Sequence, residues 1–562
     1  MFALLFSVLL AQPYVSMGVC DDWSYIWSAR VLADTGHLTY NGWGAMPLGW
    51  LAYLGALFIK LFGFSFTIVR SSGMVVSMLC AALMQRIFVR TGTTEGMATV
   101  ATLTLVLSPL FLPLSFSFMS DIPALFALVL CIYCCLRAIQ AISDRGALGW
   151  LACAAFSNII GGTVRQTAWL GVLLLMPSAA WYMRRRRYVL PVGAALWGIG
   201  VLCIALFMHW FRVQPYAVVD KVFYRYHINS VFFAANTAAT SLLCLVPIMC
   251  AFIAACAPGK RLMRNVAAIT GAITGSLLFW WAMTSPHDYF RTAPFATDGS
   301  YVTLTGMGVG TILGFPPKVV PFVVQLLLAV LMFSALFCLI VCSIGERETL
   351  LTADSRTAPN QGRYPYVSNK SLVVLFVPFV LAYLFLIVTR STVYDRYFLP
   401  LQFVFTLGIV RVYRQAISER LPRLCLAVGL VFAAYGIATM HDVFAFYRAR
   451  LDAANEIIET GIPQTAIEGG FEYDAWTQLQ QDGYANDPRI LSPPDAYHKW
   501  TPPAEVPTLC VGWTRKFFPS LHPMWHLSFA PNNCFEPSAF APVVYSTWLP
   551  PRQRTIYILE NR

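Results

Sequence analysis

Three acidic side chains stand where a general base could act at a membrane surface. Asp21 and Asp22 directly follow the first apolar segment of the chain, and Asp121 follows the end of a later one. A carboxylate in such a position could deprotonate the hydroxyl of an acceptor. The same side chains could equally be solvated ends of spans or, for Asp121, the cap of the next helix. The choice depends on the elements that carry them.

The composition is that of a protein with many membrane spans. The chain has 562 residues, of which 58% are hydrophobic and only 12% are charged, whereas a soluble globular protein has about 25% charged residues. The formal net charge of +12 does not indicate nucleic acid, because the basic residues form short clusters between apolar runs, as topology-setting charges do. We expect an all-α polytopic membrane protein with no nucleic-acid partner.

Apolar segments separated by alternating basic loops predict about thirteen spans, since a spanning helix needs roughly 20 apolar residues. The first segment has no positively charged start, so we interpret it as an uncleaved span rather than a signal peptide. An external turn at 161–166 divides the long segment 148–183, because an arginine at mid-bilayer is costly. The predicted spans are 3–19, 67–88, 97–114, 122–140, two within 148–183, 188–208, 232–257, 265–284, 319–343, 371–389, 398–413 and 422–440.

This topology places the first loop, residues 20–66, on the outer side of the membrane. Asp21 and Asp22 then face outward. Within the loop we expect two helices that lie at the membrane surface. In the first, at 22–38, apolar residues are mixed with polar ones, as in an interfacial helix. The second, at 46–62, is more apolar, but if it crossed the membrane every later basic loop would lie on the wrong side.

The tail after the last span differs in composition, being polar and rich in Pro and Trp. We predict a transmembrane domain at 1–440 and a small extracytoplasmic α/β domain at 441–562. Cys510 and Cys534 lie in this tail, where an oxidising compartment would allow a disulfide between them. No His/Cys cluster has the spacing of a zinc site, so we expect no metal and no cofactor.

Basic side chains on the outer side run against the usual bias, which keeps positive charge in the cytoplasm. Arginine offers a two-pronged fork to a phosphate, and histidine a point charge, so these residues could bind a lipid-linked phosphate. They could also pair with carboxylates of the same loops. The candidates for phosphate binding are Arg165, Arg225, His227, Arg291, Arg396 and the adjacent Tyr397.

The order of these motifs resembles that of the GT-C membrane glycosyltransferases, especially the family 39-like group of protein O-mannosyltransferases and aminoarabinose transferases. Asp21–Tyr25 is similar to the Asp-Glu-x-x-Tyr motif of their first outer loop, with an aspartate in place of the glutamate. Met46–Leu48 and the Phe-Gly…Arg pattern of 62–70 follow it. Met119–Pro123 is similar to their second acidic motif, and Asp395–Pro400 to their Arg-Tyr-x-x-Pro motif.

The resemblance implies the GT-C fold and an inverting glycosyltransferase. Such an enzyme moves a sugar from a polyprenyl-phosphate carrier to a lipid, glycan or protein acceptor, here at the periplasmic face of a bacterial inner membrane. It implies that Asp21 is the catalytic base, Asp121 a second acidic residue that organises the acceptor or the base, and Arg396 and Tyr397 contacts of the carrier phosphate. The role of Asp22, which replaces the glutamate, stays open.

Two other functions stay open from the sequence alone. A transporter or flippase of lipid-linked or small anionic solutes needs ionisable residues near the middle of spans, and broken helices. Here the charges stand mostly at span ends, which favours chemistry at the surface. A polymer ligase with a lipid-linked substrate usually centres on a large late outer loop rather than on carboxylates after the first span.

Overall fold

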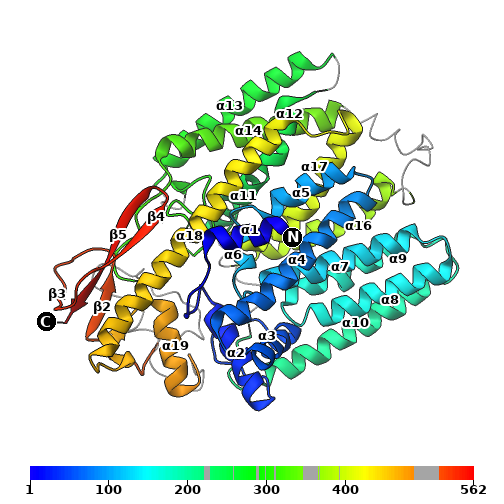
Figure 1. The fold of residues 1–562 in the computed structure, drawn as a ribbon. Helices are drawn as coiled ribbons and strands as arrows, with labels where there is room; N and C mark the ends of the chain where they lie inside the picture. Colours follow the sequence, from blue (N-terminus) through cyan, green and yellow to red (C-terminus); the bar gives the residue numbers. More distant parts are fainter. Residues whose placement is uncertain are drawn as a thin grey trace.

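The chain folds into a bundle of helices with one small sheet near its C-terminus (Figure 1). This computed structural model describes residues 1–219, 228–256, 259–286, 290–297, 299–308, 312–345, 365, 367–390, 393–485 and 518–561.

Eight of the described helices are long and apolar enough to cross a membrane. The protein is therefore an integral membrane protein, as its composition predicts. Each of the eight matches an expected span. They are α4 (Phe66–Arg90), α7 (Asp121–Gln140), α10 (Val189–Arg212), α11 (Ile228–Met249), α13 (Arg261–Thr284), α14 (Phe322–Gly345), α16 (Asn369–Val388) and α18 (Arg423–Glu459).

The other expected spans coincide with shorter, interrupted or more polar helices, so the count of about thirteen is not confirmed. The first span, expected at 3–19, is wrong in its extent, because α1 ends at Ala11 and Gln12 turns into the left-handed region at φ 48 before Pro13. The predicted break at 161–166 is present. The helices concerned are α1 (Phe2–Ala11), α5 (Glu95–Val106), α6 (Phe111–Ser115), α8 (Asp144–Gly161), η1 (Gln166–Trp169), η2 (Gly171–Leu175), α9 (Met176–Tyr182), α12 (Ala251–Ala254) and α17 (Leu399–Ala416).

Both helices expected in the first loop are present. They are α2 (Asp22–Thr35) and α3 (Gly49–Phe62), and they pack against each other. Each has 14 residues, which is too few to cross a bilayer as a helix. Their position at the membrane surface stays a prediction.

Helix α18 continues past residue 440, where we expected the last span to end, and stops only at Glu459. The final span and the start of the C-terminal region are thus one helix. Figure 1 shows α18 passing from the bundle to the small sheet. Strand β4 (Val543–Trp548) packs against this helix.

The C-terminal region combines this sheet with one helix. β1 (Ile467–Glu468) pairs in parallel with β2 (Trp525–Ser528), whereas β5 (Pro551–Glu560) pairs antiparallel with β2, β4 and β3 (Glu536–Pro537). Short η5 (Gln464–Ala466) precedes β1, and α19 (Phe471–Asp482) packs against α2. Cys534 is disulfide-bonded, and Cys510 lies outside the described residues.

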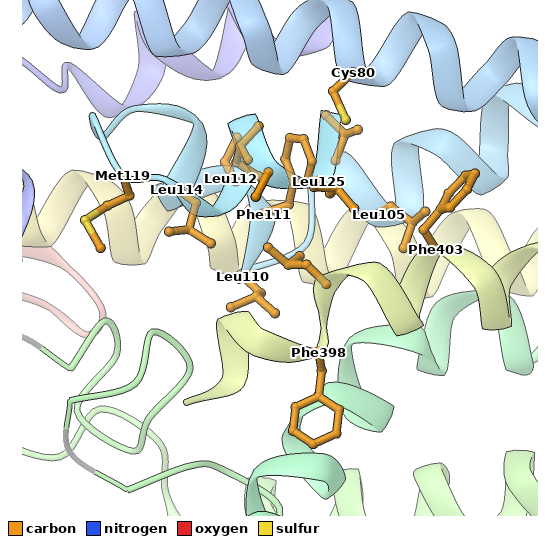
Figure 2. Packing of buried hydrophobic residues seen from close by; sticks show 14 of the residues in the cluster. Cys80, Leu105, Leu110, Phe111, Leu112, Leu114, Met119, Leu125, Phe398 and Phe403 are labelled. Carbon is orange, nitrogen blue, oxygen red and sulfur yellow. The ribbon is translucent and has the colours of Figure 1, made fainter. Parts of the chain in front are cut away.

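Apolar packing fixes the turn that carries part of the site. Figure 2 shows Leu105, Phe111 and Phe403 among the buried residues that join α5, α6 and α17, with Phe398 below them. Phe398 ends the short helix η4 (Asp395–Phe398) and is buried. Because that ring belongs to the main core, its burial holds η4 at one place on the bundle.

Candidate active site

Asp21 occupies the turn just before α2. Cys20 precedes it at φ 53, a conformation that non-glycine residues rarely adopt. The Asp21 side chain is 31% exposed, and its Oδ2 lies 3.7 Å from Arg396 Nη2. Its Oδ1 accepts a hydrogen bond of 3.0 Å from Trp43 Nε1. Asp21 is therefore a carboxylate that is held in place and still reachable.

Asp22 has a different environment. It is fully buried, and its Oδ2 accepts from Arg70 Nε at 2.7 Å. The same carboxylate accepts from the backbone amides of Val19 and Phe118. Arg70 in turn donates to the Val15 and Met17 carbonyls. Every polar atom of this cluster has a partner within the protein, so the pair ties the segment before α2 to α4.

Asp121 is the first residue of α7 and points to two arginines. Its Oδ1 accepts from Arg165 Nη1 at 2.6 Å and lies 3.8 Å from Arg396 Nε. Its Oδ2 is buried and has no partner among the described residues. Arg396 Nε is also buried and makes no hydrogen bond within the same part of the chain. Buried polar atoms are normally hydrogen-bonded, so these two atoms indicate a place that a polar ligand would complete.

Helix η4 presents Arg396 and Tyr397. Asp395 is fully buried and accepts from the backbone amides of Tyr301 and Val302, which binds the segment 299–308 to η4. The Arg396 guanidinium lies 4.4 Å from the centre of the Tyr394 ring. Aromatic rings on a guanidinium favour its charged form and limit its motion.

Tyr397 connects the two arginines of the site. The Arg165 guanidinium lies 4.8 Å from the centre of the Tyr397 ring, and that of Arg396 lies 5.8 Å from it. The centre of the Tyr301 ring, from the segment bound by Asp395, is 5.7 Å from the Arg396 guanidinium. The arginines are thus held between tyrosines instead of being directed at solvent.

The electrostatics separate the acid–base group from the cation. Burial raises the pKa of the Asp21 carboxyl, and the Arg396 guanidinium and the Trp43 N–H oppose this only in part. The partial exposure of the side chain limits the size of the shift. Burial by itself would lower the pKa of Arg396, but the nearby Asp121 carboxylate raises it well above its usual value. At neutral pH Arg396 therefore stays charged, while Asp21 is a stronger base than an ordinary aspartate.

The structure brings together only some of the residues expected from the sequence. Asp21, Asp121, Arg165, Arg396 and Tyr397 form one cluster. Arg291 is exposed and donates its Nε to the Ser285 carbonyl, outside this cluster. Arg225 and His227 lie outside the described residues.

Several residues of the cluster were not predicted from the sequence. Tyr394 adjoins the Asp395–Pro400 motif and could have been found from it. Trp43 and Tyr301 carry no local signal, because their roles come from contacts with residues distant in the chain. Among the described residues, no group of three or more His, Cys, Asp and Glu side chains could hold a metal ion.

The comparisons with known proteins give distant structural likenesses. No protein-family model and no curated protein matches the sequence. ArnT from Cupriavidus metallidurans, bound to undecaprenyl phosphate, matches over 99% of this chain and 97% of its own, at 12% identity and a TM-score of 0.41. AglB oligosaccharyltransferase from Archaeoglobus fulgidus, with an inhibitory peptide and a dolichol-phosphate, matches over 82% and 58%, at 14% identity and a TM-score of 0.35.

A further match is arabinosyltransferase EmbB from Mycobacterium smegmatis, over 82% of this chain and 43% of its own, at 16% identity and a TM-score of 0.34. All of these are GT-C glycosyltransferases, the group that the sequence motifs resemble. At identities and TM-scores this low the likeness carries no argument about activity. The function has to be argued from the site itself.

Proposed function

We propose that the chain is an inverting glycosyltransferase that moves a sugar from a polyprenyl-phosphate carrier to an acceptor hydroxyl or amine. The observation that supports this most is the pairing of an accessible carboxylate with a buried guanidinium that has an unused donor. Asp21 Oδ2 and Arg396 Nη2 are 3.7 Å apart, and Arg396 Nε makes no hydrogen bond among the described residues, its ion-pair contact with Asp121 being 3.8 Å long. A base beside a fixed cation is what transfer from a phosphate carrier requires.

In the proposed reaction the acceptor oxygen or nitrogen attacks the anomeric carbon of the donor sugar while Asp21 takes its proton. The bond between that carbon and the phosphate oxygen breaks, and its electron pair leaves with the polyprenyl phosphate. Arg396 and Arg165 stabilise the negative charge that develops there. Attack opposite the leaving phosphate inverts the anomeric configuration.

The two other carboxylates take different parts in this proposal. Asp121 contacts both arginines and so orients the cations rather than taking the proton. Tyr397 supports the same two guanidinium groups. Asp22 holds the first loop on α4 through Arg70, and we propose a structural role for it instead of the catalytic one considered from the sequence.

The bilayer and two substrates are the proposed partners. The donor is a polyprenyl-phosphate sugar, and the acceptor is a lipid, glycan or protein. We place the site and the C-terminal region on the periplasmic face of a bacterial inner membrane, because the densest basic clusters of the sequence, such as Arg184–Arg187, are predicted on the opposite side. Arg225, His227 and Arg291 stay predicted phosphate contacts without support from the described geometry.

The direct test replaces the base. Purified protein in lipid nanodiscs is supplied with a panel of undecaprenyl-phosphate hexoses and pentoses and with a bacterial envelope extract as the source of acceptors, and release of free undecaprenyl phosphate is measured. Asp21→Asn should lower the rate by about 10²–10⁴-fold, the usual contribution of a general base. Binding of undecaprenyl phosphate alone should persist, because the arginines remain.

Asp34→Asn is the matched control. Asp34 lies on the same helix α2, its side chain is 65% exposed, and it makes only a long contact of 3.9 Å with Arg30. This variant should keep the wild-type rate. If Asp21→Asn also keeps it at equal expression, Asp21 is not the base.

A further inference from the structure

Trp43 contacts the proposed base directly. Its indole Nε1 donates to Asp21 Oδ1 at 3.0 Å. Its backbone amide donates to the Asn41 side chain, which is also hydrogen-bonded to Ser24 of α2. Trp43 is therefore tied at its backbone to the helix that follows Asp21, and at its ring to the carboxylate itself.

The Trp43 ring is packed by a residue from the far end of the chain. It lies 4.8 Å from the centre of the Phe471 ring and 5.4 Å from that of Trp23. Phe471 is the first residue of α19, and its ring is also 5.6 Å from that of Phe518. These residues form a small apolar core of their own, apart from the main one. Figure 1 shows α19 beside α2, as this packing requires.

The start of α19 is fixed by α18. Arg450, on the extension of α18 beyond residue 440, makes two hydrogen bonds of 3.1 Å to Glu472 Oε2 and two more to the Gly469 carbonyl. Tyr447 donates to the other oxygen of Glu472. Arg450 and Glu472 are both almost completely buried. Gly470, at φ 91, supplies the turn that only glycine adopts readily. The backbone of Phe471 is thus held on both sides.

We propose that Trp43 is a positioning residue for Asp21, and that the C-terminal helix α19 keeps Trp43 in place through Phe471. The Trp43 N–H occupies Oδ1 of Asp21, which leaves Oδ2, the oxygen that faces Arg396, to take the acceptor proton. The C-terminal region is then a part of the catalytic centre and not a separate appendage. The role of Asp21 as a base rests on the proposed function. The contacts of Trp43 with Asp21 and with Phe471 do not depend on it.

The first test needs no turnover. The chain has 16 tryptophans, so protein labelled with 5-fluorotryptophan is compared by ¹⁹F NMR in nanodiscs with the Trp43→Phe variant, whose missing signal identifies Trp43. That signal should titrate with pH and follow the Asp21 carboxyl, and Asp21→Asn should abolish the titration. Other ionisable or charged groups that influence Asp21 are Arg396, Glu472, Asp121, Cys20, Tyr25 and Tyr394.

Phe471→Leu tests the role of α19. It should shift or broaden the Trp43 signal, because the ring contact is lost while an apolar side chain remains. The control is Phe64→Leu. Phe64 stacks on Trp476, which also belongs to α19, so this variant removes a different aromatic contact of that helix. Phe64→Leu should leave the Trp43 signal in place. The proposal is overturned if the pH titration of the Trp43 signal is unchanged in Asp21→Asn and its position and width are unchanged in Phe471→Leu.

The second test uses the transfer reaction. Trp43→Phe keeps an aromatic ring but removes the N–H donor that lowers the Asp21 pKa, so the acid limb of the pH–rate profile should move to higher pH. The kcat should fall about tenfold because the carboxylate loses the contact that orients it, with the KM for the donor unchanged. A loss caused only by poorer folding would lower the active fraction without moving the limb. If the NMR results hold and no carrier-linked sugar is turned over, the proposed function fails and the positioning role stands.

Discussion

Two clusters of aspartate and arginine begin one residue apart in the chain, and they are built in opposite ways. Asp22 and Arg70 are buried together, and every polar atom of the pair has a partner in the protein. Asp121 and Arg396 are also buried, yet each keeps a polar atom that makes no hydrogen bond among the described residues. Asp21 stands at the edge of the second cluster and is partly exposed.

This difference in hydrogen bonding suggests a structural role for the first cluster and ligand binding for the second. A buried ion pair whose hydrogen bonds are complete cannot take on a ligand without losing partners that it already has. A cluster with unused donors and acceptors gains by binding one, since an unpaired buried polar group is costly. We therefore propose that the first cluster holds the loop and that the second takes part in the reaction.

Asp22→Asn should give the largest effect on folding. Removing one partner of a buried pair costs about 3–5 kcal/mol, because the remaining charge is left uncompensated. The yield of folded protein and its thermal unfolding midpoint in detergent should both fall. The double replacement Asp22→Leu with Arg70→Met should recover part of the loss. If Asp22→Asn folds like the wild type but loses transfer, the structural role proposed for Asp22 is wrong.

Arg396→Lys should give an intermediate effect on the reaction. Lysine keeps the charge but lacks the planar fork, so the KM for the carrier-linked donor should rise about tenfold, equivalent to about 1.4 kcal/mol. Arg414→Lys is the control, because Arg414 lies on α17, pairs with Glu419 at 3.2 Å and belongs to neither cluster. Equal effects of the two replacements on donor KM would show that the second cluster is not the phosphate site.

The smallest effect concerns pH. Because burial raises the pKa of Asp21, activity should be present above that pKa and should fall as the pH drops through it. The acid limb of kcat/KM should thus lie above about 3.9, the ordinary value for aspartate. The residual activity of Asp21→Asn should show no such limb. A wild-type limb at or below the ordinary value would contradict the raised pKa of Asp21.

Part of this site could be predicted from local sequence. The position of Asp21 after an apolar segment, of Asp121 at the start of another, and of Arg396 in a short motif were enough to select them. The distinction between Asp21 and Asp22 was not available, because neighbouring residues at a helix start point about 100° apart. Asp21 therefore faces Arg396, whereas Asp22, the next residue, pairs with Arg70.

The ends of the helices could not be predicted from the sequence either. Apolar composition located the segments, but Pro13 ends α1 early and α18 continues beyond its apolar part. Hydropathy measures the preference of a segment for lipid and does not record where backbone hydrogen bonding stops. Eight of the described helices are consequently long and apolar enough to be expected spans, although α18 runs past the end predicted for it.

By itself, the sequence determined that this is a membrane protein and which ionisable residues gather at the ends of its apolar segments, since both follow from composition and order. The tertiary structure decided which carboxylate is closed off by Arg70 and which is left beside Arg396. It also decided that Phe471, from the C-terminal region, packs on the tryptophan that holds Asp21. These choices depend on contacts between residues far apart in the chain, which no local pattern encodes.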